Sequence, residues 1–203
     1  MDNNKLISLE EARNILTFAK RIYKPLNSVV IEPGDVFAYY PNSMTITVPE
    51  EFPDEELGMR ILEHVNEEFN ADFEYNLREM SIQALCHEMG HCLDFEGKIF
   101  TNQIEDYMYA DQYNRMIFDK ACHDFSEKVE EFNDDYEEYN AQEEVDEDIE
   151  YEFELRASEL AEEDRYLDYL YRMIPTEHAA DEFSARFFMT YLRGYKGCNY
   201  QVL

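Results

Sequence analysis

A nearly charge-free stretch in the middle of the chain places the strongest constraint on the fold. Asp, Glu, Lys and Arg make up 32% of the sequence, yet Glu88 is the only one of these residues between Ile82 and Leu93. Charged side chains are rarely buried, whereas apolar and small side chains usually are. The stretch is therefore predicted to lie in a buried helix that is capped by Asn76 and ends near Gly97.

The charge-free stretch contains two histidines with a glutamate between them. His87 and His91 are four residues apart, about one helical turn, so both imidazoles can reach one ion on the same helix face. Zinc suits this pair, and the carboxylate of Glu88 can take a proton from a water activated there. Such a pattern also arises by chance. Burial favours the metal site, because ionisable groups persist in a protein interior mainly when they are paired or bind a metal.

A catalytic zinc ion takes a third ligand from the protein and keeps its fourth position for water. His64 and His123 stand in charged sequence contexts and are expected at the surface. A better source is the stretch 175–185, which is predicted to form a helix that begins after a proline and has an apolar face. This helix carries Glu177 and Asp181 one turn apart.

The N-terminal part of the chain predicts a helix followed by a small sheet. Ser8 and Glu11 have the form of a capping box, and apolar residues follow at helical spacing. Three β-rich runs come next, at 29–31, 36–40 and 44–48, and the turn residues between them favour a small antiparallel sheet. The expected fold class is α+β, with this sheet packed on the buried helix.

A long segment at about residues 101–172 is almost free of Gly and Pro and is predicted to form long helices. Between Glu127 and Asp164 it has 19 acidic residues against two basic ones. Such a run usually forms a solvated helical face. At 203 residues the chain is long enough for one domain with a sizeable core. We therefore expect a single domain, residues 1–203, in which the acidic helical segment is an insertion.

The net charge of −30 argues against partners that are themselves anionic. Direct binding of nucleic acid or of a membrane is not expected, and the expected partner is a protein or peptide substrate, possibly a basic one. The sequence has neither a signal-peptide pattern nor an apolar run that could span a membrane, so we expect a cytoplasmic protein. Cys86 and Cys92 are expected to be small core residues with reduced thiols.

The histidine pair and the later acidic helix together resemble a known group of enzymes. The HExxH motif at 87–91, followed by Glu-x-x-Ala-Asp at 177–181, resembles the gluzincin arrangement of thermolysin-like and prenyl-protease-like enzymes. The longer context Glu-x-x-Ala-Asp-x-Phe-x-Ala is similar to the ImmA/IrrE-type metallopeptidases of phages and bacteria. This resemblance covers the middle and the C-terminal helices. It implies a zinc-dependent peptidase with a zincin-like fold.

The resemblance also implies a role for each residue of the site. It implies that His87 and His91 bind zinc together with Glu177 as the third ligand. Glu88 is then the general base, and Asp181 orients a ligand histidine without binding the metal itself.

Several alternatives stay open at this point. Asp181 or Glu182 could bind the metal, and Glu177 could merely favour the helix dipole from the first turn. His178 is a candidate donor to the developing oxyanion, as a histidine or tyrosine is in related enzymes. The zincin plan also uses an edge strand to hold substrate in extended form, and the run 44–48 is the candidate strand.

A different class of function would use the same residues. An acidic interaction protein or DNA mimic with a structural zinc site would explain the net charge of −30 better than a peptidase does. It explains Glu88 less well, because a structural site has no use for a base beside an open coordination position. A peptidase restricted to one regulatory target is a further alternative, which sequence does not separate from a general peptidase.

Overall fold

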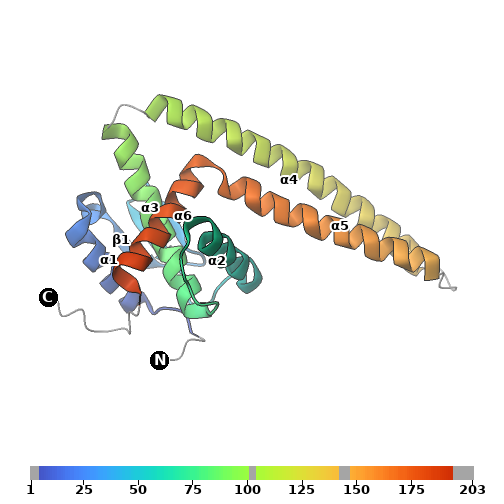
Figure 1. The fold of residues 1–203 in the computed structure, drawn as a ribbon, viewed down its shortest axis with the longest axis horizontal. Coiled ribbons are helices and arrows are strands. Elements are labelled where there is room, and N and C mark those ends of the chain that lie inside the picture. Colours follow the sequence, from blue (N-terminus) through green and yellow to red (C-terminus); the bar gives the residue numbers. More distant parts are fainter. Residues whose placement is uncertain (1–4, 101–103, 142–146, 194–203) are drawn as a thin grey trace. The chain divides into compact units, whose positions relative to one another are not determined.

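The computed structural model describes residues 5–100, 104–141 and 147–193. Contacts along the chain divide it into two compact units, residues 1–104 with 176–203 and residues 105–175. The first unit contains the sheet and the helices with the predicted site residues (Figure 1). The second unit is helical and corresponds in sequence to most of the expected acidic insertion.

The first helix, α1 (Leu9–Ile22), begins at the predicted capping box. Ser8 Oγ accepts the backbone N–H of Glu11 at 3.2 Å, and Glu11 Oε2 accepts the backbone N–H of Ser8 at 3.0 Å. Glu11 also accepts a hydrogen bond of 2.8 Å from Arg78, which ties this helix end to the motif helix. A short 3-10 helix, η1 (Lys24–Ser28), leads from α1 to the sheet.

The sheet has three strands, β1 (Val30–Pro33), β2 (Ala38–Tyr40) and β3 (Thr45–Val48), in the order β1-β3-β2. β2 pairs with β3 antiparallel, with Tyr39 opposite Ile46, whereas β1 pairs with β3 parallel. The sheet is therefore mixed, and the expectation of an antiparallel sheet is wrong. Alternation and turn residues indicate which segments are extended, but they do not indicate which strands become neighbours.

The position of β3 overturns the expectation for residues 44–48. β3 is the middle strand, and β1 and β2 occupy its two edges, so it cannot take substrate as an added strand. The outer edges of the sheet belong to β1 and β2. Met44 has a φ of 54°, and this left-handed conformation lets the chain turn from β2 into β3.

The motif helix, α3 (Leu77–Phe100), begins where the sequence predicts it, because Asn76 Oδ1 accepts the backbone N–H of Glu79 at 3.0 Å. It continues through Gly97, which was expected to follow its end, since a glycine permits a helix to end without requiring it. The prediction that the charge-free stretch of this helix is buried is confirmed. Its core residues are Met80, Ile82, Leu85, Cys86, Met89 and Cys92.

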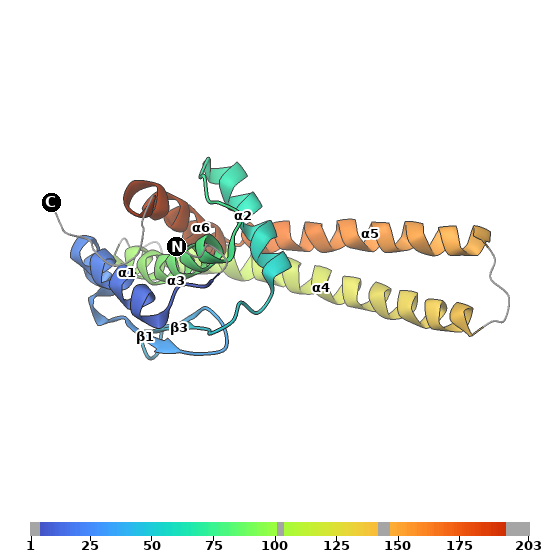
Figure 2. The same cartoon turned by 90° about the horizontal axis from the view of Figure 1, so that it is seen from below.

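Two further helices complete the described part of the first unit. α2 (Glu55–Phe69), for which the sequence analysis has no counterpart, begins where Asp54 accepts the N–H of Leu57 at 2.9 Å, and it contacts α3. α6 (Pro175–Phe187) begins at the predicted proline and continues into a π-helical turn, η2 (Phe188–Leu192). Figure 2 shows α1, α3 and α6 gathered on one side of the sheet strands.

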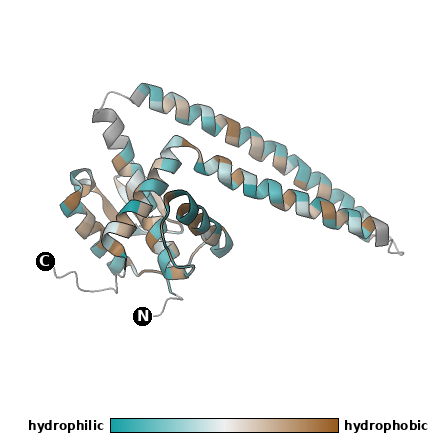
Figure 3. Cartoon of the chain, viewed as in Figure 1, coloured by the Kyte–Doolittle hydropathy of each residue, from teal (hydrophilic) through white to brown (hydrophobic). Residues whose placement is uncertain are grey.

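The second unit consists of α4 (Ile104–Asn140) and α5 (Glu147–Arg172), which run side by side in opposite directions (Figures 1 and 2). Aromatic rings pack between them; the rings of Phe132 and Phe153 lie 5.8 Å apart. The prediction of long helices in this segment is confirmed. Figure 3 shows hydrophilic residues along much of both helices, interrupted by apolar ones. No helix in the described ranges is long and apolar enough to cross a membrane.

Candidate metal centre

The motif helix α3 places its two histidines against each other. The centroids of the His87 and His91 rings are 4.6 Å apart, and the ring planes meet at 88°. Because one helical turn separates the two residues, both side chains leave α3 on the same side. His87 is buried and His91 is half-buried, so the pair lies at the boundary between the core and solvent.

Glu177, in the first turn of α6, brings a carboxylate to both histidines. Its Oε2 atom lies 3.2 Å from Nε2 of His87 and 3.4 Å from Nε2 of His91. Glu177 is only 3% exposed. The buried Oε2 atom of Glu177 therefore contacts Nε2 of His87 and Nε2 of His91. Glu177 is 86 positions after His91 in the sequence.

Asp181 lies one turn further along α6 and contacts the other nitrogen of His87. Its Oδ1 atom is 2.7 Å from Nδ1 of His87, and the side chain is fully buried. The same oxygen accepts a hydrogen bond of 3.3 Å from the side-chain amide of Gln83. An N–H at Nδ1 directed at a carboxylate leaves Nε2 as the ring atom that faces Glu177.

Gln83 is a site residue that the sequence reasoning missed. It stands one helical turn before His87 on α3 and is a polar residue inside the charge-free stretch. Buried polar side chains usually have hydrogen-bond partners, and this was the signal in the sequence that could have identified it.

The glycine of the motif allows α6 to approach α3 closely. A Cβ atom placed on Gly90 would lie 2.7 Å from Cα of Ala180, closer than such atoms can come. Ala180 stands between Glu177 and Asp181 on α6. Because Gly90 has no side chain, α6 lies close enough to α3 for the carboxylates of Glu177 and Asp181 to reach the histidines.

Glu88 is held by the sheet. Its Oε2 atom accepts the backbone N–H of Tyr39, on strand β2, at 2.7 Å. One oxygen or nitrogen atom each from Glu88, His87 and His91 lies within 4.8 Å of the others, so these three could hold a metal ion. Because the contact comes from the backbone of Tyr39, no side-chain pattern in the sequence could reveal it.

The spacing of the donors fits a small divalent cation. Two ligands at about 2.1 Å from a zinc ion in tetrahedral geometry lie about 3.4 Å from each other. The separations of Glu177 Oε2 from the two Nε2 atoms, 3.2 and 3.4 Å, match this value. Two imidazoles and one carboxylate are also a ligand set that catalytic zinc uses.

Electrostatics in the same cluster favour proton sharing when no ion is bound. Burial opposes the charged form of His87, but the carboxylates of Asp181 and Glu177 outweigh it and raise the pKa of His87 to about 10. Burial also opposes ionisation of Glu177, yet hydrogen bonds from His87 and His91 hold its pKa well below the usual range. A cation and the His87 proton therefore compete for this position.

The other candidate residues have different surroundings. Glu182 forms an ion pair of 2.5 Å with Arg186 on its own helix. The ring of His178 packs against Phe69, with 5.2 Å between the ring centroids. Its role as an oxyanion donor stays a prediction.

The two remaining histidines differ from each other in exposure. His123 is exposed, as expected, and lies 3.6 Å from Glu127. His64 is half-buried and thus less exposed than expected, and its Nε2 atom is buried without a hydrogen-bond partner among the described residues. Cys86 and Cys92 are buried, as predicted, and form no disulfide among the described residues.

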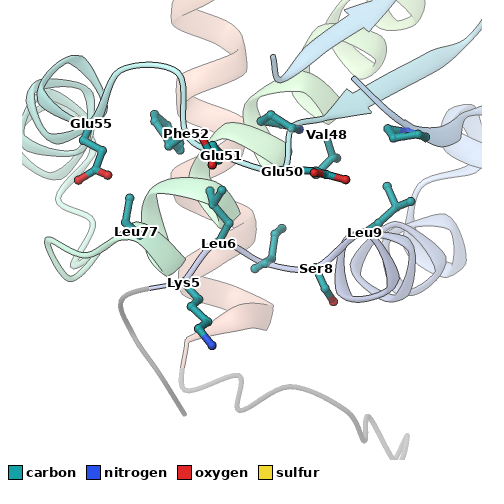
Figure 4. A pocket seen from close by; sticks show the side chains of 13 residues that line it. Lys5, Leu6, Ser8, Leu9, Val48, Glu50, Glu51, Phe52, Glu55 and Leu77 are labelled. Carbon is teal, nitrogen blue, oxygen red and sulfur yellow. The ribbon is translucent and has the colours of Figure 1, made fainter. Parts of the chain in front are cut away.

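A separate cavity of about 590 Å³ lies elsewhere in the first unit, beside the residues that precede α1 and the loop after β3 (Figure 4). None of the predicted site residues lines it. Its lining includes Leu6, Val48, Glu50, Glu51, Phe52 and Leu77.

No family model matches the chain, and neither a curated protein nor a solved structure shows significant similarity to it. Function is therefore inferred from the side chains of the site.

Proposed function

We propose that the chain is a zinc-dependent peptidase with a zincin-like site, in which His87, His91 and Glu177 bind the metal. The convergence of two imidazole Nε2 atoms on one buried carboxylate oxygen, at 3.2 and 3.4 Å, is the observation that supports this proposal most. Burying two imidazoles and a carboxylate away from water costs free energy, and a bound cation offsets this cost.

Each residue of the site has a chemical task in this proposal. Zinc, when bound, supplies a Lewis acid that polarises the substrate carbonyl and lowers the pKa of water to about 7. Glu88, steadied by the Tyr39 N–H, accepts the proton of the attacking water and passes it to the leaving amine. Asp181 keeps a proton on Nδ1 of His87, so that Nε2 presents its lone pair.

The outer edge of β2 is the surface on which an extended substrate would lie. Glu88 accepts the backbone N–H of Tyr39, so this part of β2 lies beside the base. A peptide paired with this edge brings its scissile bond beside Glu88. The class of reaction follows from the base beside the proposed metal ligands.

A peptide-library assay on wild type and Glu88→Gln tests the proposal. The variant keeps the metal and the fold but loses turnover by a factor of at least about 100, because glutamine cannot accept the proton. The exposed Glu63 of α2 offers a matched control, and Glu63→Gln retains full turnover. Metal-loaded wild type that cleaves no peptide of the library would contradict the proposal.

The same variant separates a second candidate function. Glu88 lies within the group that could hold an ion, so it could act as a ligand of a structural metal in an interaction protein. Glu88→Gln then loses metal as well, whereas a general base can be removed without loss of metal.

A further inference from the structure

Strand β1 lies at one edge of the sheet and pairs on one side only, with β3. The backbone groups on the other side of an edge strand are a template on which a further extended chain can pair. The contacts of these outward groups therefore decide whether β1 can receive another strand.

The backbone of β1 shows which carbonyl groups point outward. Val30 donates its N–H to the carbonyl oxygen of Met44, immediately before β3, at 2.9 Å. The C=O of Val29 belongs to the same peptide unit as this N–H, and the two groups of a trans peptide unit point in opposite directions. The C=O of Val29 therefore points away from β3. The two-residue repeat of a strand gives the C=O of Ile31 the same direction.

Two cationic side chains of α1 bind both of these carbonyls. Lys20 Nζ donates to the oxygen of Val29 at 2.6 Å. Arg13 donates to the oxygen of Ile31 from Nε at 3.4 Å and from Nη2 at 3.2 Å. Arg13 and Lys20 are seven residues apart, about two helical turns, so they lie on the same side of α1. The last residue of β1, Pro33, has no N–H to donate to a neighbouring strand.

This use of two cations is notable in an acidic chain, in which 47 acidic residues stand against 17 basic ones. Hydrogen bonds from a charged donor are stronger than those from a neutral donor, so an incoming strand would have to displace strong contacts. Natural sheets protect an edge strand with Lys side chains or cover it with a helix. Helix α1 contacts β1 and supplies both kinds of protection.

We propose that Arg13 and Lys20 close the outer edge of β1 to strand addition, both by an extended peptide and by a second copy of the chain. In the three-stranded sheet of the described residues, β2 is then the edge that remains for a peptide, beside Glu88. This last step rests on the proposed function, whereas the closure of β1 does not depend on it.

Sedimentation velocity of the full chain at a series of concentrations tests the closure. The variant Arg13→Met with Lys20→Met keeps long side chains but removes the donors. Its sedimentation coefficient rises with concentration, because the exposed carbonyls of β1 let copies of the chain pair, whereas that of wild type stays constant. The control is Arg21→Met with Lys24→Met, which removes the same charge from exposed positions near the same end of α1 and sediments as wild type does.

A further substitution separates edge pairing from loss of structure. Val30 is 46% exposed on β1, and a lysine on an edge strand disfavours pairing. Adding Val30→Lys to the variant without donors therefore restores the constant sedimentation coefficient, whereas association caused by unfolding would persist. If the double variant loses helix content in circular dichroism, Lys20→Met alone is compared with Arg21→Met in the same way.

Two sedimentation results would overturn the closure of β1. A constant sedimentation coefficient in the folded variant without donors means that the two cations only attach α1 to the sheet. Association that Val30→Lys does not reverse means that another surface is responsible. Cleavage of a library peptide at low chain concentration tests the step to β2, and the variant without donors retains wild-type turnover. Absence of turnover in both proteins would contradict that step and the proposed function, but not the closure of β1.

Discussion

His87 has a carboxylate on each side of its ring, and the two carboxylates act differently. Asp181 reaches Nδ1 at 2.7 Å, where its effect is on the tautomer and orientation of the ring. Glu177 reaches Nε2 at 3.2 Å, on the side from which His91 also approaches it. In the proposed metal site, the first contact orients a ligand and the second supplies one.

Substitution of the two carboxylates separates these roles. Glu177→Ala loses most of the bound metal, because it removes a ligand, whereas Asp181→Ala weakens metal binding by only about 10- to 100-fold. Glu182→Ala, which removes the same charge from the same helix, leaves affinity unchanged. Zinc titration against a competing chelator measures all three. Loss of metal in Asp181→Ala with retention in Glu177→Ala would reverse the assignment.

The raised pKa of His87 gives the site a pH dependence with a definite sign. With a pKa of about 10, metal-free His87 is protonated at neutral pH, and a cation must displace that proton. Zinc uptake at about pH 7.5 therefore releases at least one proton, and affinity falls as pH is lowered. Calorimetry in two buffers of different ionisation enthalpy counts the protons. Uptake without proton release at this pH would show that His87 is neutral in the metal-free protein.

At the residue scale, the sequence predicted the candidate site residues better than the residues that hold them in place. His87, Glu88 and His91 follow from the motif, because helical periodicity alone puts two histidines on one face. Glu177 lies beside both histidines, and its role as a metal ligand stays a prediction. Tyr39 could not be found, since it acts through its backbone N–H.

At the scale of elements, the site depends on how closely α6 approaches α3. The contact between Gly90 and Ala180 leaves no room for a side chain on the motif helix. A glycine inside a helix ordinarily destabilises it by about 0.5–1 kcal/mol relative to alanine. The glycine is therefore explained by the neighbouring helix and not by α3 itself.

Gly90→Ala tests this close approach. The added methyl group meets the backbone of Ala180 and displaces α6, so metal affinity falls although the helix propensity of α3 rises. Gly58→Ala on α2 is a matched control, because the atoms nearest to the added methyl group belong to the side chains of Met80 and Phe52 and not to a backbone, and it leaves metal affinity unchanged. Zinc titration and urea unfolding measure both variants. Wild-type affinity in Gly90→Ala would contradict the proposed role of the contact.

Helix starts could be predicted because they depend on neighbouring residues. Strand pairing could not be predicted because it depends on residues that are distant in the sequence. The capping box at Ser8 and the cap at Asn76 begin helices where the sequence places them, because both use contacts three residues apart. The parallel pairing of β1 with β3 was missed, since it joins strands that are not consecutive in the chain. The middle position of residues 44–48 was missed for the same reason.

At the scale of the whole molecule, the proposed chemistry and the densest charge belong to different units. The candidate metal ligands all lie in the first unit, while the run from Glu127 to Asp164, with its 19 acidic residues, lies in the second. The net charge of −30 thus says little about the metal centre. The near absence of Gly and Pro in this segment correctly indicated long helices.

Metal analysis of the intact chain tests the central claim most directly. After equilibration with zinc and removal of the excess, wild type is predicted to hold about one zinc ion per chain. His87→Ala and His91→Ala are predicted to hold close to none, with helix content unchanged, while His123→Ala, which alters an exposed histidine of α4, holds as much as wild type. Substoichiometric zinc in wild type that neither His87→Ala nor His91→Ala reduces would contradict the metal site and the function proposed from it.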